Sequence, residues 1–325
     1  MRRGAGRWIA AGLVLAVLSL LAVGLGSVRL SPAAVVNAML GRGDATSVTI
    51  VRVLRMPRVA LAMLLGAGLG MSGASLQGVM RNPLAEPYLL GVSGGAAVGA
   101  VVAVALGAAA AFVPVAAFVG AVVAVTVAFM VAHAAPGRGD ARVLLMAGVI
   151  VGAFANAAIM LLLANADPGT MRGALWWMMG SVSGATWRQA AWLAGYVLLG
   201  GALLVGWARQ IDILALGEDA AAGLGLEADR ASRRVYLVAS LVAAATVAAA
   251  GLVGFVGLVV PHIARRMGAG AHRGVILGSA LIGAALVVAS DLVARTALPP
   301  AELPLGAVTA VIGVPFFLLQ LRRLR

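Results

Sequence analysis

Nine continuous apolar runs, most of them about 20 residues long, follow one another along this chain. A helix that crosses a lipid bilayer needs roughly 20 such residues, and the alternation typical of a transmembrane strand is missing from these runs. Of the 325 residues, 62% are apolar and 11% are charged, which is more apolar surface than a soluble core needs. The sequence therefore predicts an all-α, polytopic membrane protein, and it excludes a soluble enzyme and a disordered chain.

The number of membrane crossings depends on how the seventh run is threaded. The runs span residues 8–26, 59–79, 91–110, 112–133, 143–164, 190–208, 235–260, 274–294 and 305–321. A single crossing by 235–260 places 11 Arg on the cytoplasmic side and 13 outside, whereas a fold-back near Gly251, Gly254 and Gly257 places 16 inside and 8 outside. Because cytoplasmic loops carry the excess of basic residues, we expect about ten transmembrane helices with both termini in the cytoplasm.

Glycine is abundant, with 43 residues, and it is concentrated in short stretches such as 66–70 and 91–95. Small residues let membrane helices approach closely, so these stretches predict tight packing, although a compositional bias explains part of the glycine content. Irregular backbone at membrane depth is tolerated only where protein or a cavity surrounds it. The fold-back within 250–262 should therefore lie inside the bundle.

Several kinds of chemistry are excluded by composition. Every basic residue is Arg, and a P-loop requires a Lys, so this chain cannot carry one. With no Cys and three scattered His, we expect no metal site. The net charge of +13 is typical of cytoplasmic loops in a membrane protein rather than of nucleic-acid binding.

Six segments, taken in order, resemble one family. They are 55–58 (RMPR), 81–95 (RNPLAEPYLLGVSGG), 176–181 (WWMMGS), 216–225 (LGEDAAAGLG), 254–262 (GFVGLVVPH) and 302–306 (ELPLG). Together they resemble the FecCD-type permeases of ABC importers, which take up iron-siderophores, haem and cobalamin. The WWMMGS and NPLAEP segments look close to those of cobalamin permeases, but siderophore and haem permeases share them, so the choice of chelate stays open.

The resemblance covers essentially the whole chain and implies one transmembrane domain over residues 1–325. It implies a transport subunit rather than an enzyme, working in the bacterial inner membrane as a homodimer surrounded by lipid. Two ATP-binding subunits would bind ATP and Mg, and a periplasmic or lipid-anchored binding protein would deliver the substrate. The resemblance implies no cofactor within this chain.

The segment 209–230 holds the densest acidic cluster of the sequence, which on its own is typical of a solvated loop. In the family this loop forms short coupling helices that dock on the ATPase subunit. Gly223 and Gly225 suit the corner between two helices, because glycine adopts positive φ without steric cost. The candidate coupling residues are Leu216, Gly217, Glu218, Asp219, Ala220, Gly223 and Gly225.

Arg52, Arg55 and Arg58 lie where sorting by charge would not place them, at the predicted outer face. In the family, Arg at the positions of Arg55 and Arg58 pairs with acidic residues of the binding protein, and Arg295 matches a further docking Arg. An arginine fork suits bidentate binding of a carboxylate. Alternatively, Arg55 and Arg58 face lipid headgroups, and Asp291 neutralises Arg295 one helical turn away.

Two loops on the predicted cytoplasmic side resemble the family's gate. Asn82 and Leu84 lie in the loop stiffened by two prolines, and Ala141 and Arg142 open the fifth apolar run. The plain alternative is a rigid turn and a loop Arg placed by topology alone.

Two further classes of protein are weighed against an importer subunit. An ion-coupled secondary transporter needs ionisable residues at mid-membrane, and none is clearly placed there. A membrane-embedded enzyme needs a nucleophile–base pair, a metal pair or clustered carboxylates within spans, and none is visible.

Overall fold

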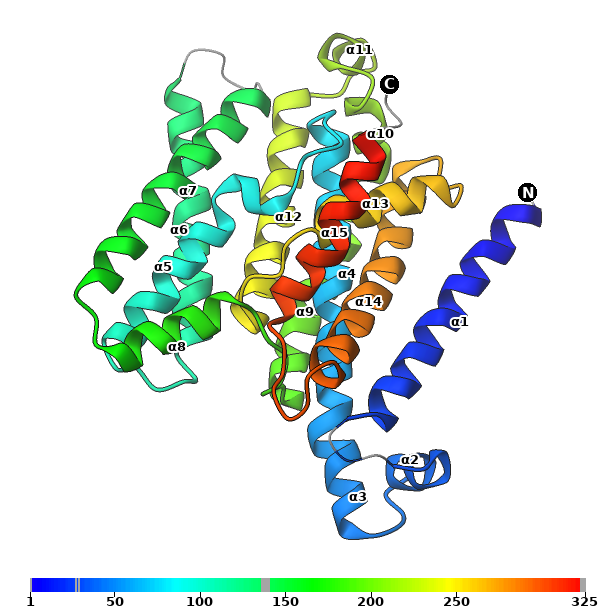
Figure 1. Ribbon diagram of the computed structural model, residues 1–325. Helices are drawn as coiled ribbons and strands as arrows, with labels where there is room; N and C mark the ends of the chain where they lie inside the picture. The colour runs from blue at the N-terminus through cyan, green and yellow to red at the C-terminus, as the bar shows by residue number, and fades with distance from the viewer. Residues whose placement is uncertain (1, 27, 29, 136–140, 322–325) are drawn as a thin grey trace.

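The computed structural model describes residues 2–26, 28, 30–135 and 141–321, which form a helical bundle (Figure 1). Its long or apolar helices are α1 (Arg2–Gly24), α4 (Met56–Val79), α5 (Val92–Ala105), α6 (Val113–Ala134), α7 (Ala141–Ala164), α9 (Trp187–Gly206), α12 (Ala228–Ala250), α14 (His272–Thr296) and α15 (Leu305–Leu321). Shorter helices are α2 (Pro32–Met39), α3 (Ala45–Thr49), η1 (Ile50–Arg55), η2 (Pro87–Leu90), α8 (Pro168–Met178), α10 (Ala208–Leu214), α11 (Glu218–Gly223) and α13 (Val256–Arg266). The predicted all-α class is confirmed for the described residues.

Helix α4 is the central element of the bundle, and its last two turns are completely buried. Gly66 and Gly70 face α14, where a Cβ atom would lie 2.0 Å from the Gly283 carbonyl oxygen and 2.3 Å from that of Ser279, respectively. Gly68 faces the other way, against Thr246 of α12. The glycine stretch therefore packs two faces of one helix, as the sequence predicted.

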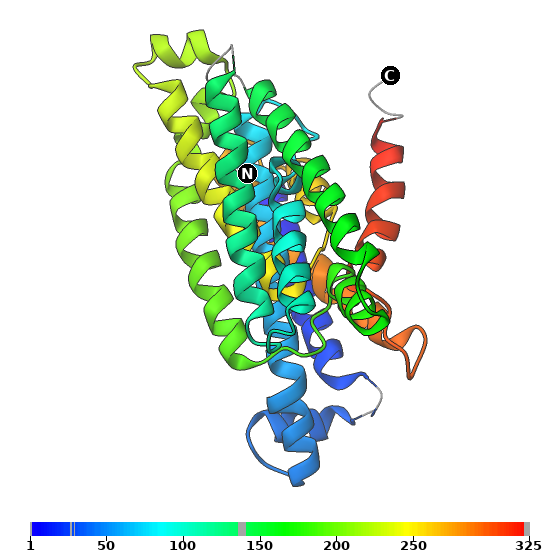
Figure 2. The same cartoon turned by 90° about the vertical axis from the view of Figure 1, so that its left-hand side faces the viewer.

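A second group of helices is formed by α5, α6 and α7, which lie beside one another in both views (Figures 1 and 2). Gly95 of α5 packs on α6, where an added Cβ would lie 2.4 Å from the Gly120 carbonyl oxygen. The predicted close packing of 91–95 is thus observed as well. Helix α12 joins this group to the helices around α4, since it contacts α4 and α9 as well as α5 and α6.

The apolar run 235–260 breaks where the sequence predicted. Helix α12 ends at Ala250, where Gly251 has a φ of +73°. The segment after Gly251 leads back toward the end from which α12 came, and α13, which begins at Val256, lies across the bundle (Figure 1). Only glycine adopts such a φ readily. The residues around the break are largely buried, so the fold-back lies within the bundle as expected.

The bundle has two ends, which we name by the short helices there. Helix α11 lies at one end, and α2, α3, α8 and the loop 297–304 lie at the other (Figure 1). Seven described helices are long and apolar enough to cross a membrane, and α5 and α15 are shorter apolar helices. Ten crossings and cytoplasmic termini stay predictions, although α1 begins and α15 ends on the side of the bundle nearer α11 (Figure 1).

Candidate functional site

A buried ion-pair cluster lies at the α3 end, where α4 and α14 meet the loop after α14. Arg58 donates from Nε and Nη2 to Asp291, with Nη2 2.8 Å from Oδ1, and from Nη1 and Nη2 to Glu302 at 2.8 and 2.9 Å. Asp291 is 2% exposed and also lies 3.5 Å from Nε of Arg295. One guanidinium thus holds two carboxylates that are supplied by different parts of the chain.

Arg55 and Arg295 cap the end of α1. The last carbonyl groups of a helix have no partner within it, and here two arginines supply donors. Arg55 donates to Val23 and Gly24 at 2.9 and 2.8 Å and also to the Val28 carbonyl, and Arg295 donates to Ala22 at 2.6 Å. Helix α1, which lies on the outside of the bundle, is therefore anchored by side chains of η1 and α14.

Docking of a binding protein by these arginines stays a prediction. The sequence did not indicate that their side chains are buried. Arg55, Arg58 and Arg295 are only 6%, 8% and 7% exposed and already hold partners within the chain. The alternative in which Arg55 and Arg58 face lipid headgroups is wrong, because both side chains are buried in protein. The contact between Asp291 and Arg295 that the spacing suggested is present.

The broken segment between α12 and α13 is held by two side chains from the loop between α4 and α5. The Val253 backbone N–H donates to the Tyr88 hydroxyl at 3.0 Å, and the Phe255 N–H donates to the Glu86 carboxylate at 2.9 Å. Phe255 has a φ of +69°, an unusual conformation for a large side chain. The proline-stiffened loop therefore fixes the fold-back, a role that its sequence alone did not reveal.

The WWMMGS segment also contacts the fold-back. The Ser181 N–H donates to the Ala250 carbonyl at 2.8 Å, and the Gly306 N–H donates to the Met179 carbonyl at 3.1 Å. An added Cβ on Gly306 would lie 2.5 Å from the Leu252 carbonyl oxygen, which leaves room for no other residue. Four of the six family segments thus meet around residues 250–255.

An apolar hollow opens beside this junction. It is lined by Met178, Met179, Leu252, Gly254, Phe255, Pro304, Gly306, Ala307 and Ala310. A neighbouring hollow shares Met178 and Leu252 and adds Ser93, Gly94, Ala97, Gly152 and Asn156. Neither lining contains a charged residue, so both hollows present uncharged surfaces.

At the α11 end, the candidate coupling residues form an exposed corner. Helix α11 ends in a Schellman motif, in which Leu226 N–H donates to Ala221 and Gly225 N–H donates to Ala222, both at 2.9 Å. Gly225 has the positive φ of +74° that the sequence predicted, whereas Gly223 is an ordinary helical residue and that expectation was wrong. The positive φ of +116° lies instead at Gly217, before the helix.

Both charged and apolar side chains of this corner are accessible. Leu216 and Leu224 are 68% and 63% exposed on either side of α11. Glu218 and Asp219 occupy its first turn, and Ala220 is exposed beside them. Glu218 lies 4.0 Å from Nη2 of Arg81, the residue that precedes the candidate gate loop.

The candidate gate residues are only partly described. Asn82 accepts a hydrogen bond from the Leu84 N–H at 2.9 Å, and Leu84 is 44% exposed. Ala141 is the first residue of α7, but the side chains of Ala141 and Arg142 lie outside the described residues. Whether the two loops close together stays a prediction.

Asp212 and His272 form a contact that the sequence did not suggest. The Asp212 carboxylate accepts from the His272 backbone N–H at 2.9 Å and lies 2.6 Å from its Nδ1. The ring packs directly over Gly78 of α4. Helix α10, which leads into α11, is thereby fixed to the start of α14.

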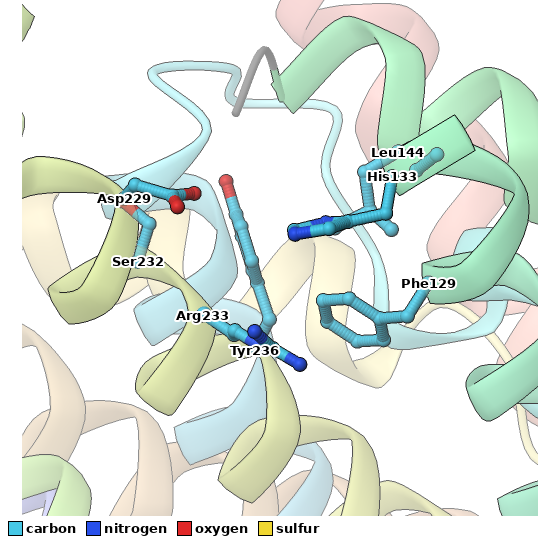
Figure 3. Close-up of a pocket in the computed structure, with 8 residues that line it drawn as sticks. Phe129, His133, Leu144, Asp229, Ser232, Arg233 and Tyr236 are labelled. Carbon is cyan, nitrogen blue, oxygen red and sulfur yellow. The ribbon is translucent and has the colours of Figure 1, made fainter. Parts of the chain in front are cut away.

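A further small hollow lies between the ends of α6, α7 and α12. Figure 3 shows the Tyr236 hydroxyl directed between Asp229 and His133, with Phe129 below the histidine. Its lining also includes Ala132, Leu144, Ser232 and Arg233. Since α12 starts just after the α11 corner, this hollow belongs to the same end of the molecule.

Comparison with known proteins identifies the family. The FecCD transport family matches residues 14–323. The chain belongs to this family. The cobalamin import system permease protein BtuC of Halobacterium salinarum is 42% identical over 279 residues, which are 85% of this chain and 74% of that protein. The Fe(3+)-citrate import system permease protein YfmE of Bacillus subtilis is 36% identical, over 95% of this chain and 92% of that protein.

The three-dimensional fold of this FecCD protein is also known from a solved relative. A metal-chelate type ABC transporter in an inward-facing conformation superposes with a TM-score of 0.88 at 26% identity, covering 97% of this chain and 98% of that one. The FecCD chain is therefore a multi-pass membrane permease with an ABC permease fold. Both comparisons place the chain among transport permeases, which favours an importer subunit over the two other classes weighed from the sequence.

Proposed function

We propose that this chain is the membrane-spanning permease subunit of an ABC importer that moves an iron chelate or cobalamin across the membrane. The observation that carries the proposal is the family match over residues 14–323. Relatives are named as permeases for cobalamin, ferric citrate and hemin. The uncharged hollows beside Met178 suit a metal held inside an organic ligand better than a bare cation, which would need oxygen ligands.

The working complex is a homodimer of this chain with two ATP-binding subunits and a periplasmic or lipid-anchored binding protein, in the bacterial inner membrane. ATP and Mg are bound by the ATPase subunits, since a chain without Lys has no P-loop. This chain contributes no cofactor site and is not an enzyme itself.

The ATPase subunit docks at the α11 corner, within residues 209–230. Exposed apolar residues such as Leu216 and Leu224 are of the kind that protein interfaces bury. Movement of α11 reaches the gate through Arg81, which lies beside Glu218 and precedes Asn82. Leu84, Ala141 and Arg142 complete the gate at this end.

The binding protein docks at the other end through Arg55, Arg58 and Arg295. Three arginines and two carboxylates leave the cluster with an excess of one positive charge. An acidic surface on a partner would balance this charge, and the arginine fork suits a carboxylate.

Reconstitution into liposomes tests the function. ATP-driven uptake of labelled cobalamin, hemin or a ferric chelate should require this chain, an ATPase subunit and a binding protein together. The isolated chain should hydrolyse no ATP. Uptake without any ATPase subunit, or ATPase activity of the chain alone, would contradict the proposal.

A substitution pair tests the docking site of the ATPase. Changing Leu216 and Leu224 to Ser removes exposed apolar area and should weaken association with the ATPase subunit severalfold or more. Changing Asp167 to Asn alters one charge at the opposite end and should leave association unchanged, since Asn also caps a helix. Equal association of both variants would place the docking site elsewhere.

A further inference from the structure

Most of the N–H donors of the Arg58 side chain already have acceptors within the chain. An arginine has five N–H donors. Nε and one Nη2 donor serve Asp291, while one Nη1 and the other Nη2 donor serve Glu302. A single Nη1 donor is left, whereas bidentate binding of a carboxylate needs two parallel donors. Arg58 therefore cannot bind another carboxylate bidentately while both internal partners are in place.

The two internal partners differ in their freedom to leave. Asp291 is 2% exposed, projects from the packed helix α14, and lies against Arg295 as well. Glu302 has a side chain that is 40% exposed and is carried by the loop between α14 and α15. Displacing Glu302 returns it to water, but displacing Asp291 would leave a buried charge unpaired, which costs far more. Only Glu302 can be exchanged.

The surroundings favour such an exchange. Arg55 makes its hydrogen bonds to carbonyl groups of residues 23–28, and Nε of Arg295 is buried without a hydrogen-bond acceptor. Once Glu302 leaves, Asp291 is the single carboxylate that pairs with Arg58 and Arg295, and Arg55 has only carbonyl groups as partners. An incoming carboxylate would then enter a site with two uncompensated positive charges.

We propose that Glu302 is an internal competitor that occupies Arg58 until a carboxylate of the binding protein replaces it. The inference rests on the proposed function, because it requires a protein partner with an acidic surface at the α3 end. In the free permease, Glu302 satisfies the fork and lowers the affinity for the partner. On docking, an Asp or Glu of the partner takes the two donors of Arg58, and Glu302 turns toward solvent.

The test measures the affinity of the purified complex, in lipid nanodiscs, for binding proteins from the same genome. Glu302→Gln keeps the shape of the side chain but removes its charge. An ion pair that is open to solvent is worth about 0.2–1 kcal/mol, so the variant should bind its partner about 1.4- to fivefold more tightly at low salt. The gain should shrink with added salt. Asp167→Asn, which removes a negative charge elsewhere at the same end, should bind like the wild type.

The outcomes separate the two proposals. Unchanged or weaker binding by Glu302→Gln, with a wild type that binds in a salt-dependent manner, overturns the exchange but leaves the importer function standing. A wild-type complex that binds none of the binding proteins overturns docking at this surface and the exchange together. The gain must also vanish when Arg58 is changed to Gln. If Glu302→Gln does not fold, Glu302→Ala also removes the charge and provides the same comparison.

Discussion

Gln77 of α4 donates to the carbonyl oxygen of Gly257 at 3.2 Å, the oxygen that Pro261 leaves without a partner inside α13. A proline within a helix lacks the N–H that would bond to the carbonyl four residues earlier. In lipid or a packed bundle, an unpaired carbonyl is costly. Gln77 also accepts from Arg265 at 2.8 Å, so one buried amide joins α4 to two points of α13.

This relationship predicts that the cost of replacing Gln77 depends on the presence of Pro261, which a double-mutant cycle can measure. Gln77→Leu should destabilise the protein by about 1–3 kcal/mol, because it leaves a buried acceptor unsatisfied. In a Pro261→Ala background the backbone N–H of residue 261 can bond to Gly257, so the same change should cost clearly less. Thermal unfolding of the four proteins measures the difference. An equal cost in both backgrounds would show that Gln77 does not compensate for the proline.

A second prediction concerns the contact between α4 and α14. Gly66→Ala places a Cβ 2.0 Å from the Gly283 carbonyl oxygen, so the helices must separate. Overpacking of this kind typically costs about 1–3 kcal/mol. Gly195→Ala is the matched control, because that glycine lies within α9 with open space around it. The unfolding temperature of Gly195→Ala should stay the same or rise. A similar loss of stability in both variants would refute the packing argument.

The sequence predicted the features that depend on neighbouring residues. The glycine stretch 66–70 indicated close packing, and Gly251 indicated the break, because both follow from local conformational preference. Local conformational preference does not reveal which distant residues these segments contact. Pro261 indicates an orphan carbonyl at Gly257, but nothing in the sequence identifies Gln77, 180 residues away, as the donor.

In the candidate site, too, the sequence indicated the residues but not their partners. Unusual arginines at positions 55 and 58 were recognisable from the topology, yet their burial depends on side-chain partners that are distant in sequence. Arg58 bonds to residues 233 and 244 positions away, and Arg295 caps a helix 273 positions away. Such long-range pairs arise from tertiary packing, which one sequence does not encode in a readable pattern.

A third prediction tests the membrane topology. Reporter fusions after Arg325 and within the 165–175 loop should lie on opposite sides of the membrane, with the C-terminal fusion in the cytoplasm. The excess of Arg at the α11 end gives this orientation. A C-terminal reporter on the outer side would contradict ten crossings and would exchange the proposed ATPase and binding-protein surfaces.

The last prediction uses the titration of Glu302. Its carboxylate accepts hydrogen bonds from Arg58, which lowers the pKa of that carboxyl below its usual value of 4.5. A carboxyl whose pKa is lower in the folded state stabilises the fold above its unfolded pKa, and this contribution is lost as the pH falls through the folded pKa. The wild type should therefore be more stable than Glu302→Gln by a constant margin from pH 8 down to about pH 5.

Below that range the margin should shrink, because protonated glutamate and glutamine then offer Arg58 the same neutral partner. Unfolding temperatures of the two proteins at matched ionic strength measure the margin. The affinity gain of Glu302→Gln should likewise stay constant between about pH 6 and pH 8, where Glu302 remains ionised. A margin that instead changes near neutral pH would mean that another titrating group, and not the Glu302 carboxylate, controls the occupancy of Arg58.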